Sequence, residues 1–193
     1  MQRKCGQMYV LAGVAVVACL LGGAGSVEAA QQESAVKQTL PACREAGAGG
    51  PEDVVRALYR AYPPVDHPTK FLTLEPKEVL SKYFAGKPAE LLAQIRQCSK
   101  RTGDDCGPGY DLMYDSNAVE ISDLRICAMA GGKKTVTVQF RDAGRPKFVT
   151  YELTHTSSGW RIADILYAKK PGDSYSDSLI KLLTDLLSSE SSK

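Results

Sequence analysis

The sequence predicts an α+β domain, in which three helices pack on one face of a curved antiparallel sheet of about four strands and a short helix closes the chain. The main observation behind this prediction is a change in the spacing of apolar residues. They recur every three or four positions between residues 51 and 103, as in amphipathic helices, and alternate with polar residues between about 119 and 168, as in half-buried strands. Helical spacing returns from residue 174 onward.

The first predicted helix is PEDVVRALYRAY, residues 51–62. Pro51 suits the first helical position, acidic residues follow in the first turn, and the pair Pro63 and Pro64 stops the run. The residues expected on its buried face are Val54, Val55, Leu58, Tyr59 and Tyr62.

Two more helices are predicted over residues 73–86 and 87–103. In the first, Thr73 is a candidate N-cap and Gly86 ends the run; in the second, Pro88 opens the helix and Gly103 closes it. Their apolar positions are Val79, Leu80, Tyr83 and Phe84 in the first, and Leu91, Leu92, Ile95 and Cys98 in the second.

Strand alternation begins at Val119 and changes phase at Ser122 and Asp123, which predicts a bulge or bend at these two residues. Further strands follow as KTVTVQF, KFVTYELTHT and GWRIADILYA, separated by turns. The closing helix is predicted in SYSDSLIKLLTDLLSS, with Ser176 as a candidate cap.

The N-terminus is predicted to be a signal peptide, residues 1–29. Two basic residues precede an apolar run that is too short for a comfortable membrane span, and Val27 and Ala29 form an A-x-A-like cleavage site before Ala30. The alternative is VVAC, which resembles a bacterial lipobox and would make Cys19 the lipidated first residue of a membrane-tethered protein. We therefore expect an exported, periplasmic protein that touches a membrane only in the second case.

The mature chain is expected to form one domain at 51–188, preceded by a flexible segment at 30–50 and followed by a disordered tail at 189–193. Removing the signal peptide leaves 22 basic and 21 acidic residues. This near balance carries no electrostatic footprint for nucleic acid or anionic lipid, so neither is an expected partner.

Four cysteines remain after cleavage, an even number in a compartment where disulfides persist. The short loop between Cys98 and Cys106 can satisfy disulfide geometry, and elimination then pairs Cys43 with Cys127. A zinc site is the weaker alternative, because the sequence has no C-x-x-C and its two histidines are far from the cysteines. No cofactor or metal is expected.

The polar stretch GPGYDLMYDSNAVEISDLRI, residues 107–126, is the first place to look for chemistry. Its oxygen ligands and those just before it could hold calcium, but their spacing does not match an EF-hand. A carboxylate and a tyrosine could form an acid–base pair in an apolar pocket. We expect instead that the stretch enters the sheet and shapes the rim of the domain. The acidic and amide residues weighed for calcium are Asp104, Asp105, Asp111, Asp115, Asn117 and Glu120.

The histidines and the tryptophan complete the candidate site. His67 lies in a Pro-rich loop, where a solvated side chain is the simpler interpretation. His155 falls in phase with Tyr151 and Leu153 and is expected on the packed or pocket side, and Trp160 is expected in the core or pocket wall. The ligand-binding candidates are Tyr59, Tyr62, Tyr110, Tyr114, Asp115, His155 and Trp160.

Several segments carry a family resemblance: ALYRAY, YDLMYDSNAVEISDLRI, YELTHTSSGWRIADILY and SLIKLL. Together they resemble domain-of-unknown-function family 3828, exported bacterial proteins that look like nuclear-transport-factor-2-like domains. The resemblance runs from about Val54 to Leu183, and it differs at Asn117 and Ala118, where the family leads us to expect an acidic or glutamine–aspartate pair. It implies a cone-shaped fold and export, and no chemistry.

The function expected from the sequence is a non-enzymatic binding domain whose ligand is a protein or a small apolar molecule. Two alternatives stay open. An enzyme would need a paired, pKa-shifted aspartate and tyrosine in the cone pocket, and an immunity or inhibitor protein would need an exposed concave surface with aromatic and charged anchors.

Overall fold

A computed structural model of the 193-residue chain describes residues 40, 42–44, 47, 49–64, 71–117, 120–128, 134–168, 174 and 176–190. The described residues all lie within one unit of the chain, residues 37–193. The predicted signal peptide, Cys19, His67 and Val119 lie outside the described residues.

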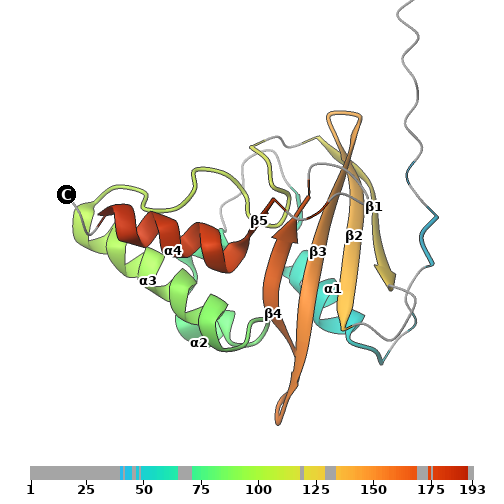
Figure 1. The fold of residues 1–193 in the computed structure, drawn as a ribbon, viewed down its shortest axis with the longest axis horizontal. Coiled ribbons are helices and arrows are strands. Elements are labelled where there is room, and N and C mark those ends of the chain that lie inside the picture. Colours follow the sequence, from blue (N-terminus) through green and yellow to red (C-terminus); the bar gives the residue numbers. More distant parts are fainter. Residues whose placement is uncertain are drawn as a thin grey trace, which may run out of the picture. The chain divides into compact units, whose positions relative to one another are not determined.

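The predicted α+β class is confirmed, with one strand more than expected. Five antiparallel strands form a single sheet in the order β1-β2-β3-β4-β5, so each strand pairs with its neighbour in sequence (Figure 1). A C-terminal helix, α4 (Leu179–Glu190), follows β5.

The first helix, α1 (Glu52–Ala61), forms where the sequence predicts it. Pro51 caps it with helical backbone angles, and Tyr62 leaves the helical region before the two prolines. Val55, Leu58 and Tyr59 are buried, so the predicted apolar face is the packed one.

The predicted helix over 73–86 is wrong. The segment instead forms a 3-10 turn, η1 (Leu72–Leu74), and a four-residue helix, α2 (Lys77–Leu80). Pro76 has no amide hydrogen and holds Glu75 in an extended conformation, and this extended residue separates η1 from α2. After α2, Phe84 forms a β-bridge with Ile162, and this pairing takes backbone groups that a helix would use.

The next helix, α3 (Gly86–Thr102), matches the prediction except that Gly86 begins it rather than ending its predecessor. Gly103 closes it in the left-handed conformation, with φ of 80° and its amide bonded to the Ser99 carbonyl. The buried face carries Leu91, Leu92, Ile95 and Cys98, as predicted.

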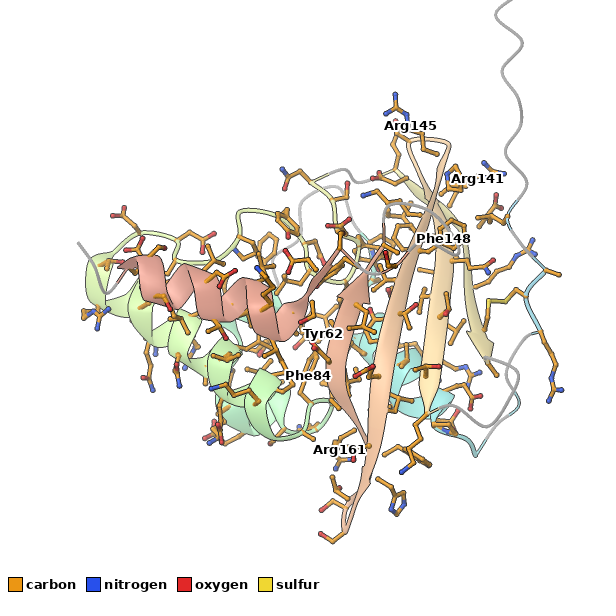
Figure 2. The ribbon with its side chains drawn as sticks, in the orientation of Figure 1. Tyr62, Phe84, Arg141, Arg145, Phe148 and Arg161 are labelled. Atoms are coloured by element: carbon orange, nitrogen blue, oxygen red, sulfur yellow. A yellow bond between two sulfur atoms is a disulfide. The ribbon has the colours of Figure 1, made fainter. Side chains whose placement is uncertain are left out.

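The sheet consists of β1 (Ile121–Ala128), β2 (Thr135–Asp142), β3 (Arg145–Thr156), β4 (Gly159–Tyr167) and β5 (Asp177–Ser178). The predicted bulge is confirmed: the β1–β2 register shifts between Ser122 and Arg125, and Asp123 has a φ of 53°. The hairpin between β2 and β3 turns at Ala143 and Gly144, near which Figure 2 shows Arg141 and Arg145.

The two-residue strand β5 was not predicted, and it changes how the last helix begins. Ser176, the predicted cap, bonds to the Tyr167 carbonyl. Ser178 caps α4 instead, because its hydroxyl accepts the Lys181 amide at 3.2 Å. Asp164 on β4 accepts a second amide of the first turn, that of Ile180, and so ties α4 to the sheet.

The core lies between the helices and one face of the sheet, which we call the inner face. Matching rows of buried residues cross it, for example Val136, Tyr151 and Ile165 on β2, β3 and β4. The helix α1 packs against β1 and β4, while α3 and α4 pack on one another beside β4 (Figure 1). Figure 2 shows Tyr62 and Phe84 between the helices and β4, and both are buried.

Two disulfides join Cys43 to Cys127 and Cys98 to Cys106, the pairing predicted from the sequence. They fit an oxidising, exported setting. The first also brings the Arg44 carbonyl to the Ala128 amide at the edge of the sheet. In the described part of the chain, no helix has both the length and the hydrophobicity to cross a membrane.

Candidate functional site

The loop at Asp111–Ser116 lies in the interior of the domain, against the inner face of the sheet. Its two ends form a β-bridge, and the Asp111 carboxylate accepts the Met113 amide at 2.8 Å. The three residues at its tip are between 1% and 3% exposed: Leu112, Met113 and Tyr114. The sequence predicted that this stretch shapes the rim of the domain, but the tip of the loop is more deeply buried than a rim would be.

Tyrosine hydroxyls hold this loop by its main chain. Tyr59 donates to the Met113 carbonyl at 2.9 Å, and Tyr167 donates to the Leu112 carbonyl at 3.0 Å. Tyr151 donates to the Tyr59 hydroxyl, also at 2.9 Å, so two phenols act in series. In the opposite direction, Tyr114 donates from the loop to the Tyr62 carbonyl at 3.2 Å. We call these five residues the interior tyrosines.

Burial raises the pKa of every interior tyrosine above its usual value, because the interior disfavours the phenolate. Nearby acidic groups and tyrosines add to the rise. Burial also raises the pKa of the Asp111 carboxyl, although the Met113 amide opposes this shift. The phenols therefore stay protonated, and the hydroxyls of Tyr59, Tyr114 and Tyr167 donate to main-chain carbonyls.

Asp115 turns the chain out of the loop with a φ of 48°. Its carbonyl accepts Lys147 Nζ at 2.7 Å, and its carboxylate lies 3.2 Å from the same nitrogen. Ser116 then donates to the Asp142 carboxylate at 2.6 Å. These contacts attach the base of the loop to the β2–β3 hairpin, which is a structural role.

An open groove of about 380 Å³ lies outside this core, between η1, the end of α3 and the turn at 107–110. We call it the Leu74–Tyr110 groove. Its lining is mainly apolar, with carboxylates at Asp104 and Asp105. Leu74 is 50% exposed and is the only exposed large apolar side chain in the described part of the chain.

The wall of this groove is closely packed at Gly107. A methyl group added there would meet the Asp105 carboxylate at 2.9 Å and the Thr73 methyl at 3.3 Å, so glycine allows the turn to approach η1. The Asp105 carboxylate also accepts the Gly107 amide at 2.8 Å. The Cys98–Cys106 disulfide anchors the turn to α3. The groove is thus preformed by covalent and hydrogen-bonded contacts.

Two further hollows lie among the described residues, apart from the Leu74–Tyr110 groove. One, of about 250 Å³, lies between Tyr110, Asp115 and Asp177, and it shares Tyr110 with the larger groove. The other, of about 370 Å³, lies between α1 and the bulged part of β1. Its basic side chains are Arg56, which pairs with Asp53, and Arg60.

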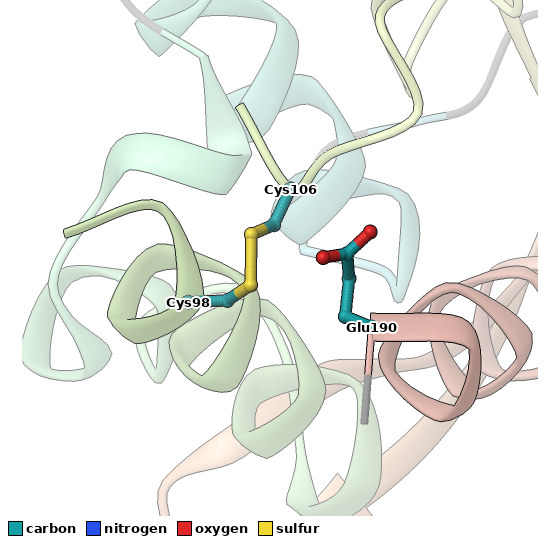
Figure 3. Close-up of side chains that lie close together, drawn as sticks. All are labelled: Cys98, Cys106 and Glu190. Carbon is teal, nitrogen blue, oxygen red and sulfur yellow. A yellow bond between two sulfur atoms is a disulfide. The ribbon is translucent and has the colours of Figure 1, made fainter. Parts of the chain in front are cut away.

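Glu190, at the end of α4, brings its carboxylate to the Cys98–Cys106 disulfide (Figure 3). One ligand atom from each of the three residues lies within 4.8 Å of the others. Metal binding by cysteine requires thiolates, which the disulfide removes. The cluster is therefore a contact between α4 and the disulfide while the bond is intact.

The remaining candidates lie elsewhere. His155 and Trp160 are cross-strand partners at the β3–β4 hairpin, with ring centroids 5.1 Å apart in an edge-on arrangement. His155 is exposed, contrary to the expected packed side, although Tyr151 and Leu153 in the same phase are buried; it lies at the end of β3, next to the hairpin turn and beyond the packed part of the sheet. Trp160 is half-buried, and His67 is outside the described residues. The structure therefore does not join His155 or Trp160 to the tyrosines.

Sequence reasoning missed the residues that matter most in this geometry. Tyr151 and Tyr167 are in strands, where their phase indicates burial but not a hydroxyl aimed at a distant loop. The groove residue Leu74 comes from the segment mistaken for a helix, and Phe71 lies just before that segment. Comparison of the chain with protein-family models, curated proteins and solved structures gave no match.

Proposed function

We propose that the chain is an exported, non-enzymatic binding domain whose ligand is a protein or a small apolar molecule. The observation that carries this proposal is the buried loop at 111–116, whose tip fills the interior against the inner face. An acid–base site needs a carboxylate or phenol that is free to meet a substrate. Here the loop carbonyls and the interior tyrosines already bond to one another.

The same contacts argue against the alternative of an acid–base enzyme. Asp111 and Tyr114 are a carboxylate and a phenol of the same buried loop, and burial raises the pKa of both. However, Asp111 accepts an amide of its own loop, and Tyr114 donates to the Tyr62 carbonyl. Either group would have to break a buried hydrogen bond before it could act on a substrate.

Binding is proposed to occur in the Leu74–Tyr110 groove. Its volume of about 380 Å³ falls within the range of small-molecule sites, ~300–1,000 Å³. Leu74 offers an exposed apolar contact, and the disulfide-anchored turn reduces the cost of ordering the site on binding.

The family resemblance and the localisation belong to the same proposal. We propose a cone of the nuclear-transport-factor-2-like type in domain-of-unknown-function family 3828, supported by the antiparallel sheet and the helices on its inner face. We also propose a periplasmic protein cleaved before Ala30. Mass spectrometry of the exported protein should find Ala30 at its N-terminus, and a diacylglyceryl Cys19 would instead place it on a membrane.

Titration with Nile red, a neutral fluorescent probe for apolar sites, tests the binding proposal. The native chain should bind the probe, and Leu74→Ser should weaken binding several-fold, because it removes the exposed apolar contact. Leu74→Met keeps an apolar side chain at the same position and should bind normally. Equal binding by native and Leu74→Ser chains would refute this groove as the site.

A further inference from the structure

Within the described part of the chain, the acidic groups of the Leu74–Tyr110 groove have no ion-pair partner. Asp104 and Asp105 are exposed, and among the described residues neither forms a salt bridge. Among the described residues, no lysine or arginine lines the groove, although the Arg96 guanidinium donates to the Leu74 carbonyl at 2.9 Å. The basic side chains nearest in sequence, Lys100 and Arg101, lie in the last turn of α3 outside the lining. The groove therefore combines an apolar surface with two carboxylates that form no ion pair in the described part of the chain.

The neighbouring hollow differs in this respect. It also carries two carboxylates, but Asp115 lies 3.2 Å from Lys147 Nζ and Asp177 lies 4.0 Å from Lys181 Nζ. Each of these acids thus has a cation from the protein itself. This contrast places a ligand's positive charge at Asp104 and Asp105 rather than in the neighbouring hollow.

Tyr110 offers a second contact for such a ligand. It lines both hollows, and within the described part of the chain its hydroxyl makes no hydrogen bond. This sets it apart from the five interior tyrosines, whose hydroxyls or carbonyls hold the buried loop. A phenol ring at the edge of an apolar groove can pack against the apolar body of a ligand whose ammonium group lies at the two carboxylates.

The size of the surface favours a small molecule over a protein. A stable protein interface buries about 800 Å² on each partner and usually rests on several apolar or aromatic anchors. In the described part of the chain, Leu74 is the only large apolar side chain that is exposed. One hollow with one exposed anchor suits a ligand that enters it as a whole.

From these features we infer that the ligand is a small organic cation, with an apolar body against Leu74 and Tyr110 and an ammonium group at Asp104 and Asp105. The inference rests on the proposed function, because it assumes that the groove binds a ligand. It adds the charge and the chemical class of that ligand.

Three probes that share one apolar body test the charge: 4-phenylbutylamine, 4-phenylbutanol and 4-phenylbutyrate. Each is titrated into the full, disulfide-bonded chain labelled with nitrogen-15, and amide chemical shifts report both affinity and place. We expect shifts at residues 71–74 and 103–110. The amine should bind about fivefold more tightly than the alcohol at low salt, and the carboxylate more weakly than both. The preference for the amine should shrink as salt screens the charges.

A pair of substitutions that removes charge but keeps side-chain shape separates electrostatic attraction from packing. Asp104→Asn with Asp105→Asn keeps the shape of both side chains and should remove the fivefold preference, while the alcohol binds as before. The control is Glu152→Gln, which removes one negative charge from an exposed position outside the groove and should leave the preference for the amine unchanged.

The outcomes distinguish the two proposals. If the alcohol shifts the groove amides as strongly as the amine does, or if the double variant keeps the preference, the inference of a cationic ligand is overturned and the groove remains a binding site. If none of the three probes shifts the groove amides, the groove is not a small-molecule site, and that part of the proposed function fails as well. Shifts confined to the hollow between α1 and β1 would also overturn both.

Discussion

Replacing Tyr59 by phenylalanine tests how the buried loop is held. The Tyr59 hydroxyl donates to the Met113 carbonyl and accepts from the Tyr151 hydroxyl, at 2.9 Å in each case. The variant therefore leaves one buried acceptor and one buried donor without their partners. Because each unsatisfied buried group costs about 1–3 kcal/mol, we expect Tyr59→Phe to lower the free energy of unfolding by about 3 kcal/mol.

Two further variants sharpen this test. Tyr151→Phe removes only a donor to Tyr59, which still bonds to Met113, so its cost should be about 1 kcal/mol. The double variant should cost about 1 kcal/mol less than the sum of the single changes, because Tyr151 no longer loses an acceptor. Tyr110→Phe is the matched control. Its hydroxyl has no hydrogen bond in the described part of the chain, and it should cost less than about 0.5 kcal/mol.

The assay is urea unfolding followed by far-ultraviolet circular dichroism, with the free-energy change taken from the shift in midpoint at a common slope. A Tyr59→Phe variant as stable as Tyr110→Phe would refute the reasoning. It would mean that the hydroxyl is not needed to satisfy the loop.

Three other results are expected. Burial raises the pKa of Tyr59, Tyr151 and Tyr167, so the folded state keeps their protons above about pH 10 while the unfolded chain loses them. Stability should fall there by about 1.4 kcal/mol per pH unit for each of the three, with tyrosinate absorbance and circular dichroism changing together. Phenolate formation in a chain that stays folded would contradict this. Replacing the Cys98–Cys106 pair by serine should lower the free energy of unfolding by about 2.5 kcal/mol, and replacing the Cys43–Cys127 pair should lower it by about 4.5 kcal/mol, as measured by urea unfolding. The difference is expected because the two disulfides close loops of 8 and 84 residues. Equal costs would argue against the loop-entropy explanation. Asp115→Asn should lower the free energy of unfolding by less than about 1 kcal/mol, because asparagine tolerates the positive φ and the Lys147 bond to the carbonyl remains. Asp115→Val should lower it by about 1–2 kcal/mol more, because a β-branched residue is strained at positive φ. Similar unfolding midpoints for both variants would exclude a backbone effect.

Local patterns predicted most of the elements, because their causes are local. The α1 face, the end of α3 at Gly103 and the bulge at Asp123 each depend on residues within a few positions of one another. The helix predicted over 73–86 failed because its competitor is distant. Phe84 pairs with Ile162 on β4, and this gain does not show in the local spacing of apolar residues.

The site was harder to predict for the same reason. The stretch YDLMYD shows apolar residues between acids, which indicates partial burial, but its partners come from α1, β3 and β4. The bond between Tyr59 and Met113 spans 54 positions, and that between Tyr167 and Leu112 spans 55. The Leu74–Tyr110 groove likewise depends on the approach of η1 to a turn beyond α3. Neither arrangement leaves a periodic signal in the sequence.

The loop at Asp111–Ser116 fills the interior of the domain, and we propose that ligands bind outside it. A crystal structure of the chain soaked with 4-phenylbutylamine tests this most directly. We predict density for the probe between Leu74 and Tyr110, with Tyr59 still bonded to the Met113 carbonyl. Density for the probe among the interior tyrosines, with the loop displaced, would contradict the claim and restore the interior as the functional site.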